Sequence, residues 1–178
     1  MRLVLLKGLP GCGKSTIGRA LSKQLGWPLI DKDDIKDVLS PYVEGAGGYS
    51  YDVMMSIARR QLLQGLNVIC DSPLLYAMTY KRAQVIASEA GADLVLVECH
   101  CSDTEQWRQR IDSRKTSALA THSQVDWEKM ADYRRAVACE ANYEIRHPLL
   151  MIDTVRDLET CVGEIVEWLE QETVVRIL

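Results

Sequence analysis

The fold of this 178-residue chain is decided by the stretch Gly8-Leu9-Pro10-Gly11-Cys12-Gly13-Lys14-Ser15. An apolar run, Arg2–Lys7, precedes this stretch, and apolar residues at helical spacing follow it. A glycine-rich turn between a strand and a helix lets backbone N–H groups converge on phosphate oxygens, where side chains would block the approach. The helix N-terminus adds a partial positive charge. The pattern therefore predicts a phosphate-binding loop.

The order of residues in this loop indicates a nucleoside triphosphate site. Its glycines do not fit the Gly-x-Gly-x-x-Gly spacing of dinucleotide-binding proteins, but they fit Gly-x-x-x-x-Gly-Lys-Ser. In this motif the lysine contacts the β- and γ-phosphates, and the serine hydroxyl binds Mg²⁺. We therefore expect ATP and Mg²⁺ as cofactors. The residues expected at the nucleotide are Gly8, Pro10, Gly11, Cys12, Gly13, Lys14, Ser15 and Thr16.

Short apolar runs alternate with amphipathic stretches along the rest of the chain. Strands are expected at residues 2–7, 28–31, 67–71, 94–99 and 149–153. Five strands alternating with helices predict an α/β domain, in which a parallel sheet is covered by helices on both faces. Ligands bind such sheets beyond the carboxyl ends of the strands.

The chain is expected to form a single domain over residues 1–173, followed by an apolar tail, 174–178. The glycine-rich stretch 44–48 is expected to be flexible. The polar, irregular stretch 115–124 lies between two arginine-bearing helices, and it would suit a lid that excludes water from a reaction.

Composition favours a cytoplasmic protein with a small-molecule partner. The net charge is −4, whereas proteins that bind long nucleic acids usually carry a basic face. No apolar stretch is long enough to span a membrane, and the first apolar run is cut by Lys7 and a glycine-rich turn. The six cysteines lack the spacing of a disulfide framework, so reduced thiols are expected.

An acidic cluster, Asp31-Lys32-Asp33-Asp34, follows the second expected strand. An acceptor hydroxyl needs a carboxylate within hydrogen-bond reach to orient it and to receive its proton. Alternatively, Asp33 or Asp34 caps the short helix that follows. Both interpretations stay open for different residues of the cluster.

Three further charged residues lie where phosphoryl-transfer chemistry would use them. Asp71 ends the third strand, where an acid can orient Mg²⁺ or its waters, although it could instead stabilise the turn at Ser72. Arg110 and Arg114 are four residues apart and share a helix face, as a pair aimed at a phosphoryl group would. The alternative for both arginines is a solvated helix face.

The chain resembles the small P-loop kinases of the AAA-33-like group, which phosphorylate a hydroxyl. Relatives include chloramphenicol phosphotransferase, the polynucleotide 5′-kinases, the zeta toxins and the gluconate and shikimate kinases. The resemblance covers residues 3–153. It is carried by the phosphate loop and by three further elements: Ile30-Asp31-Lys32-Asp33-Asp34, Val68-Ile69-Cys70-Asp71 and Trp107-x-x-Arg110-x-x-x-Arg114.

The resemblance implies a three-layer α/β/α fold with strand order 2-3-1-4-5, and it implies roles for individual residues. Asp33 would be the general base for the acceptor hydroxyl. Lys14 and Arg114 would stabilise the transferring phosphoryl group, with Arg110 near the nucleotide. Ser15 and Asp71 would hold the metal, although an Asp-Ser-Pro-Leu sequence replaces the commoner Asp-Gly-Thr-Asn and leaves metal or acceptor binding open for Asp71.

The acceptor is expected to be a small molecule with a hydroxyl group, contacted by Asp31, Lys36 and Tyr51. Its pocket would be built from loops such as 41–51 and 72–80, which vary most among proteins. Two other functions stay open on the sequence. The acceptor could be a nucleoside or a polynucleotide 5′-hydroxyl, or the chain could be a non-catalytic ATP-binding switch.

Overall fold

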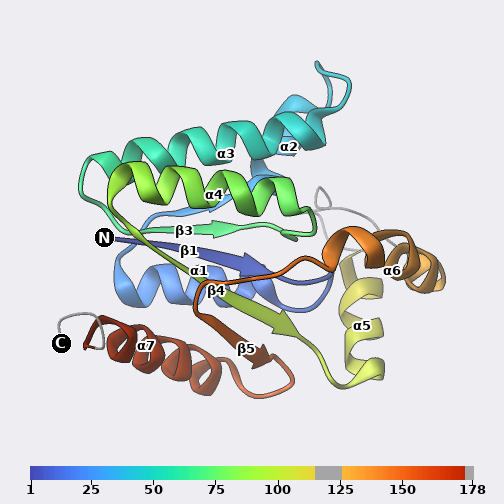
Figure 1. Cartoon of the computed structure of the whole chain (residues 1–178). Helices are drawn as coiled ribbons and strands as arrows, with labels where there is room; N and C mark the ends of the chain where they lie inside the picture. Colours follow the sequence, from blue (N-terminus) through green and yellow to red (C-terminus); the bar gives the residue numbers. More distant parts are fainter. Residues whose placement is uncertain (115–125, 175–178) are drawn as a thin grey trace.

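A computed structural model describes residues 1–114 and 126–174, which form a parallel five-stranded sheet between two layers of helices (Figure 1). The strands are β1 (Arg2–Lys7), β2 (Leu29–Asp31), β3 (Val68–Asp71), β4 (Asp93–His100) and β5 (Leu149–Asp153). The helices are α1 (Lys14–Leu25), α2 (Lys32–Leu39), α3 (Ala46–Leu63), α4 (Ala77–Ala90), α5 (Thr104–Arg114), α6 (Trp127–Ala141) and α7 (Leu158–Val174). The order β2-β3-β1-β4-β5 confirms the expected topology.

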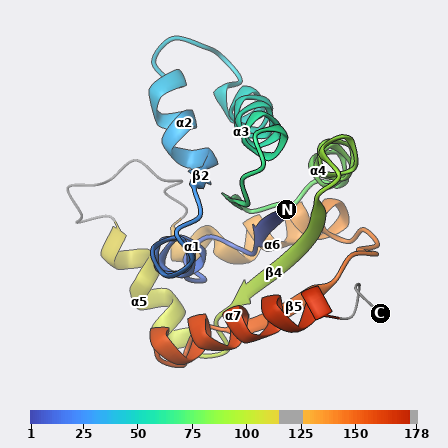
Figure 2. The ribbon, with the colours of Figure 1, turned by 90° about the vertical axis from the view of Figure 1, so that its left-hand side faces the viewer.

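The central strand β1 is apolar throughout its middle because both of its faces are covered. Leu3, Val4, Leu5 and Leu6 are at most 1% exposed. Alternate residues of β1 belong to two separate core clusters, one shared with α3 and α4 and the other with α1 and α7. Figure 2 shows α4 and α7 on opposite faces of the sheet.

The parallel register brings the carboxyl ends of the strands to one edge of the sheet. Asp31 at the end of β2 is opposite Asp71 at the end of β3. The strand order reverses beside β1, which pairs with β3 on one side and β4 on the other. The phosphate loop follows β1 at this switch point, where ligands bind in such sheets. Helices α5 and α6 lie beyond the same edge (Figure 1).

The structure differs from the sequence-based expectation at two places. Helix α3 begins inside the stretch expected to be flexible, because Gly45 adopts a left-handed N-cap conformation (φ 75°) and Ala46 is buried. Helix α7 continues to Val174, the first residue of the expected tail. The expected lid, 115–124, and residues 175–178 lie outside the described residues.

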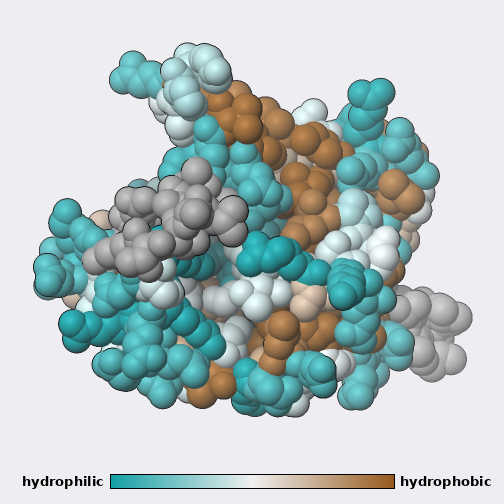
Figure 3. Space-filling view, turned by 180° about the vertical axis from the view of Figure 1, so that it is seen from behind, coloured by the Kyte–Doolittle hydropathy of each residue, from teal (hydrophilic) through white to brown (hydrophobic). Residues whose placement is uncertain are grey.

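Apolar side chains also gather on part of the outer surface. Figure 3 shows them in the upper half of the molecule, on the side of the sheet that holds α2 and α3. Val38 of α2 and Ile57 and Leu63 of α3 are exposed there. Within the described ranges, no helix is both long enough and apolar enough to cross a membrane.

Two adjacent leucines at the end of α3 test how much the core contributes to stability. Leu62 is fully buried in the cluster shared with α4, whereas Leu63 is 53% exposed. We expect Leu62→Ala to lower the free energy of unfolding by about 2–5 kcal/mol, because it removes buried methyl groups and leaves a cavity. Leu63→Ala should change it by less than about 0.5 kcal/mol. Urea denaturation followed by circular dichroism measures both, and equal losses would contradict the packing described.

Candidate functional site

The phosphate loop has the backbone that its glycines make possible. Gly8, Gly11 and Gly13 have φ values of 141°, 78° and 89°, a region that side chains disfavour. The loop ends at Lys14, the first residue of α1, so the free N–H groups of that helix face the space inside the loop. The arrangement is a preformed anion site of the kind found at helix N-termini.

Neighbouring elements fix the outside of this loop. A Cβ atom added to Gly11 would lie 2.6 Å from Cγ1 of Ile111, and one added to Gly8 would lie 2.3 Å from the Cys99 carbonyl oxygen. The indole N–H of Trp107 donates a hydrogen bond to the Pro10 carbonyl at 2.8 Å. Helix α5 and strand β4 therefore clamp the loop from outside.

The side chain of Lys14 lies close to the phosphate loop, where it is expected to contact the phosphates. Its side chain is buried, and Nζ donates to the Leu9 carbonyl at 3.0 Å. The sulfur of Cys12 lies 3.8 Å from the same Nζ. The ammonium group is thus positioned by loop atoms, and a phosphate inside the loop would lie within its reach.

Asp71 ends β3 as a buried carboxylate in the same cavity as Lys14 and Ser15. Its Oδ2 atom has no hydrogen-bond partner among the described residues. A buried carboxylate oxygen without a donor is unfavourable unless a cation binds it. Hard oxygen ligands suit Mg²⁺, which keeps several waters and takes one or two protein oxygens. Asp71 and the Ser15 hydroxyl therefore fit a Mg²⁺ ion.

Helix α2 positions Asp33. This helix begins at Lys32, earlier than expected, and Asp31 is its N-cap, accepting a hydrogen bond from the Asp33 N–H at 2.8 Å. The capping role expected for Asp33 or Asp34 thus belongs to Asp31, the residue also expected near the acceptor. The Asp33 carboxylate is consequently available to line the cavity.

Lys32 lies beneath Asp33 and balances its charge. Lys32 is buried, and its Nζ lies 2.6 Å from Oδ1 of Asp33. Oδ1 is buried and has no hydrogen-bond partner among the described residues apart from this ion pair. The same Nζ lies 5.3 Å from the ring centroid of Tyr51. The carboxylate is therefore held between a buried cation and the open cavity.

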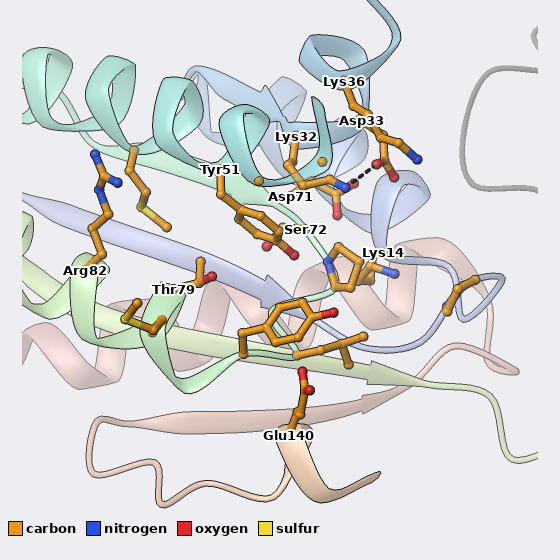
Figure 4. A pocket seen from close by; sticks show the side chains of 18 of the residues that line it. Lys14, Lys32, Asp33, Lys36, Tyr51, Asp71, Ser72, Thr79, Arg82 and Glu140 are labelled. Atoms are coloured by element: carbon orange, nitrogen blue, oxygen red, sulfur yellow. Dashed lines mark ion pairs between the residues drawn. The ribbon is translucent and has the colours of Figure 1, made fainter. Parts of the chain in front are cut away.

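One cavity of about 990 Å³ joins these groups. Lys14 and Ser15 line it at the phosphate loop, Asp33 and Lys36 line it from α2, and Tyr51 lines it from α3. Figure 4 shows the labelled side chains around the common space. The structure thus brings the expected base and two expected acceptor contacts to the cavity that holds the phosphate-loop lysine.

The two arginines of α5 face different spaces. Arg110 donates to the Thr154 hydroxyl at 2.8 Å and to the Thr154 carbonyl at 2.7 Å. It lines a smaller cavity of about 350 Å³ together with Gly13 and Thr16, on the nucleotide side of the loop. Arg114 lines both this cavity and the larger one. Arg114 is therefore the arginine of α5 that reaches both cavities.

Thr154 is a site residue that the sequence reasoning missed. Its hydroxyl lies 2.9 Å from the Cys12 carbonyl oxygen and 3.0 Å from that of His100. A Cβ atom on Gly13 would lie 3.1 Å from its side chain. Thr154 lies directly after strand β5, at the carboxyl edge of the sheet, and this position could have identified it as a site residue. Thr154 links the phosphate loop to Arg110.

The cysteines are free thiols where the structure describes them. Cys12, Cys70, Cys99 and Cys161 are buried, and burial raises the pKa of the Cys70 thiol to about 12. Over residues 1–114 and 126–174, no three His, Cys, Asp or Glu side chains form a group that could hold a metal. Loops of this kind bind Mg²⁺ through fewer protein ligands, so this finding does not bear on Asp71.

Three solved structures resemble nearly the whole chain. A protein from Chloroflexus aurantiacus, described as a candidate kinase, has a TM-score of 0.75 at 22% identity, covering 96% of this chain and 97% of that one. APS kinase from Mycobacterium tuberculosis has a TM-score of 0.64 at 17% identity, covering 95% and 97%. Shikimate kinase from Aquifex aeolicus has a TM-score of 0.55 at 16% identity, covering 97% and 98%. These similarities confirm the P-loop kinase fold.

Among curated proteins, the similarity is confined to short segments. The shikimate kinase of Corynebacterium glutamicum is 54% identical over 33 residues, 18% of this chain and 20% of that protein. The shikimate kinase of Mycobacterium leprae is 69% identical over 29 residues, 16% of this chain and 15% of that protein. The matched segment thus spans a fifth or less of these relatives.

A protein-family comparison covers much more of the chain. The model of the family AAA_33, described as an AAA domain, matches residues 3–139. This range contains the phosphate loop, the cluster around Asp33, Asp71 and both arginines of α5. The match confirms the resemblance identified from the sequence motifs. The chain belongs to the AAA_33 family of AAA domains.

Proposed function

We propose that this protein is an ATP- and Mg²⁺-dependent phosphotransferase that moves the γ-phosphoryl group to a hydroxyl of a small molecule. The observation that carries this proposal is the cavity of about 990 Å³ that joins the phosphate loop to Asp33. A site that only bound ATP would need the loop alone. The carboxylate at the other side of the cavity is what a hydroxyl acceptor requires.

The nucleotide half of the site would hold ATP by its phosphates. The N–H groups of the loop and Lys14 would bind the β- and γ-phosphates, with Arg110 on the nucleotide side. Ser15 and Asp71 would hold Mg²⁺, which supplies charge neutralisation on the phosphate oxygens. Relatives named as shikimate kinase support an acceptor of small size.

The transfer itself would use Asp33 as the base. The acceptor oxygen forms a bond to the γ-phosphorus as its proton passes to the Asp33 carboxylate. The bond between that phosphorus and the β–γ bridging oxygen breaks, and ADP leaves with the bonding electron pair. Lys14 and Arg114 line the space where negative charge develops, so they would stabilise the transition state.

Replacing the base tests the central assignment. We expect Asp33→Asn to lower kcat by about 10²- to 10⁴-fold, because the acceptor hydroxyl loses its proton acceptor. The KM for ATP should change little. Asp34→Asn, at the exposed neighbouring position, is the matched control and should retain activity. Coupled measurement of ADP release and of the phosphate ester decides the matter, and full transfer by Asp33→Asn would refute the assignment.

The metal assignment predicts a shift in the Mg²⁺ dependence. Asp71→Asn keeps the size of the side chain but removes its charge. We expect the Mg²⁺ concentration for half-maximal activity to rise by about ten- to a hundredfold. Isothermal titration of an ATP analogue at fixed Mg²⁺ gives a readout independent of turnover. An unchanged Mg²⁺ requirement in both measurements would assign Asp71 to the acceptor or to structure.

Thr154 should affect nucleotide binding more than acceptor binding. Thr154→Val removes the hydroxyl that bonds Arg110 and the phosphate-loop carbonyl while preserving the shape of the side chain. We expect the KM for ATP to rise about tenfold, the effect of losing a hydrogen bond to a charged group. Thr154→Ser should restore wild-type behaviour. A rise in the acceptor KM alone would contradict the role given to this hydroxyl.

A further inference from the structure

The acceptor end of the large cavity is rich in tyrosine. Tyr51, Tyr76, Tyr133 and Tyr143 line it from α3, from the residue before α4, from α6 and from the residues after α6. Burial is the largest effect raising the pKa of the Tyr51, Tyr133 and Tyr143 phenols. These side chains therefore present neutral rings and hydroxyls at physiological pH.

Two of these rings already have partners within the protein. Lys32 lies over the ring of Tyr51. Tyr143 stacks on Tyr80 with ring centroids 5.5 Å apart, and it donates to the Leu74 carbonyl at 2.7 Å. Among the described residues, Tyr76 and Tyr133 have neither a ring partner nor a cation. Tyr76 is 45% exposed, whereas Tyr133 is partly buried and packs against the cluster of Trp107, Ile111 and Met130. A ligand in the cavity can therefore contact the ring of Tyr76 and the part of Tyr133 that lines the cavity.

Glu140 adds a negative charge to the same part of the cavity. It lies seven residues after Tyr133 on α6, which places both side chains on one face of that helix. Figure 4 shows its carboxylate directed into the cavity from the side opposite Lys32 and Asp33. No basic side chain of the described residues forms an ion pair with it.

The remaining charges of this cavity are paired or lie toward the phosphates. Lys32 pairs with Asp33, and Arg82 pairs with Asp52. The other basic residues that line the cavity belong to the phosphate loop, to α2 beside Asp33 and to the end of α5: Lys14, Lys36 and Arg114. The cavity thus has basic groups beside the phosphate loop, and the exposed carboxylate of Glu140 lines it together with the rings of Tyr76 and Tyr133.

We propose that the acceptor is a cationic alcohol, whose ammonium group binds between Tyr76, Tyr133 and Glu140 while its hydroxyl reaches Asp33. This inference rests on the phosphotransferase function proposed above. Aromatic faces with a nearby carboxylate attract ammonium groups through the ring quadrupole and through charge. Leu75 and Ala77 line the cavity as apolar wall for the carbon chain. The Glu140 carboxylate is exposed, so it would repel an anionic alcohol and would stay solvated by water beside a neutral one.

Paired acceptors test the charge preference directly. Each primary amino alcohol in a series of increasing chain length is compared with its N-acetyl derivative, which keeps the hydroxyl and loses the charge. The hydroxy acid of the same length serves as the anionic member. We expect kcat/KM for the best amino alcohol to exceed that of its N-acetyl partner by about tenfold or more. The phosphate ester and ADP are both quantified.

Substitutions in α6 test which residues cause the preference for a cationic acceptor. Glu140→Gln should raise the KM for the amino alcohol about tenfold, with little change in kcat, and should leave the N-acetyl partner within about twofold of wild type. Glu128→Gln, at an exposed position of the same helix outside the cavity, is the control. Tyr133→Leu, which removes the aromatic ring, should raise the KM for the amino alcohol more than Tyr133→Phe, which keeps the ring.

The outcomes separate this inference from the proposed function. Equal or better transfer to N-acetyl compounds or hydroxy acids overturns the cationic class and leaves the phosphotransferase intact. A rise in thermal stability with amino alcohols and a non-hydrolysable ATP analogue, without phosphate ester formation from ATP, keeps the ammonium site and overturns the phosphotransferase. Neither binding nor transfer across the whole series overturns both.

Discussion

The site depends on one constraint: the glycines of the phosphate loop are packed so closely that they leave no space for side chains. Gly8 packs against the Cys99 carbonyl, Gly11 against α5 and Gly13 against Thr154. Three elements that are distant in sequence thus meet at one turn. The loop cannot take its shape until β4, α5 and β5 are in place, because each supplies one of these surfaces. Nucleotide binding is therefore coupled to the packing of the whole carboxyl edge of the sheet.

The same edge concentrates buried charge that the protein balances unevenly. Both carboxylates have a buried oxygen without a hydrogen-bond donor in the described part of the chain, but Asp33 forms an ion pair with Lys32, whereas no described basic side chain forms one with Asp71. An unpaired buried oxygen lowers stability unless a ligand supplies the missing partner. This difference is what a phosphoryl-transfer site needs, since one carboxylate must accept a proton and the other must accept a cation. The parallel register of β2 and β3 explains why Asp33 and Asp71 lie at the same edge of the sheet. Asp71 is opposite Asp31, and α2, which carries Asp33, begins directly after Asp31.

Much of the fold followed from local pattern. The strands were recognisable as short apolar runs, and the phosphate loop by its residue order, because each signal lies within a few consecutive residues. The sheet order came from the resemblance, since residue pattern alone does not specify which strands are neighbours. Asp33 could be picked from its place after a strand, but Asp31 as the cap could not be distinguished from it. Thr154 escaped notice because its partners Cys12 and Arg110 are 142 and 44 residues away.

Lys36 and Tyr51 are expected from the sequence in the large cavity, but the residues that α6 contributes there are not. Trp107 and Arg110 of α5 hold the phosphate loop and Thr154, so substitutions there disturb the nucleotide half. Tyr133 and Glu140 lie on α6 and line the cavity, but Tyr133 also packs against the cluster of Trp107, Ile111 and Met130, as does Leu9 of the phosphate loop. A substitution of Tyr133 would therefore disturb the packing beside the loop as well, whereas a substitution of the exposed Glu140 would change the charge of the cavity without altering that packing. A shared phosphate loop therefore does not specify the acceptor, because exposed positions in the cavity such as Glu140 can differ independently of the loop.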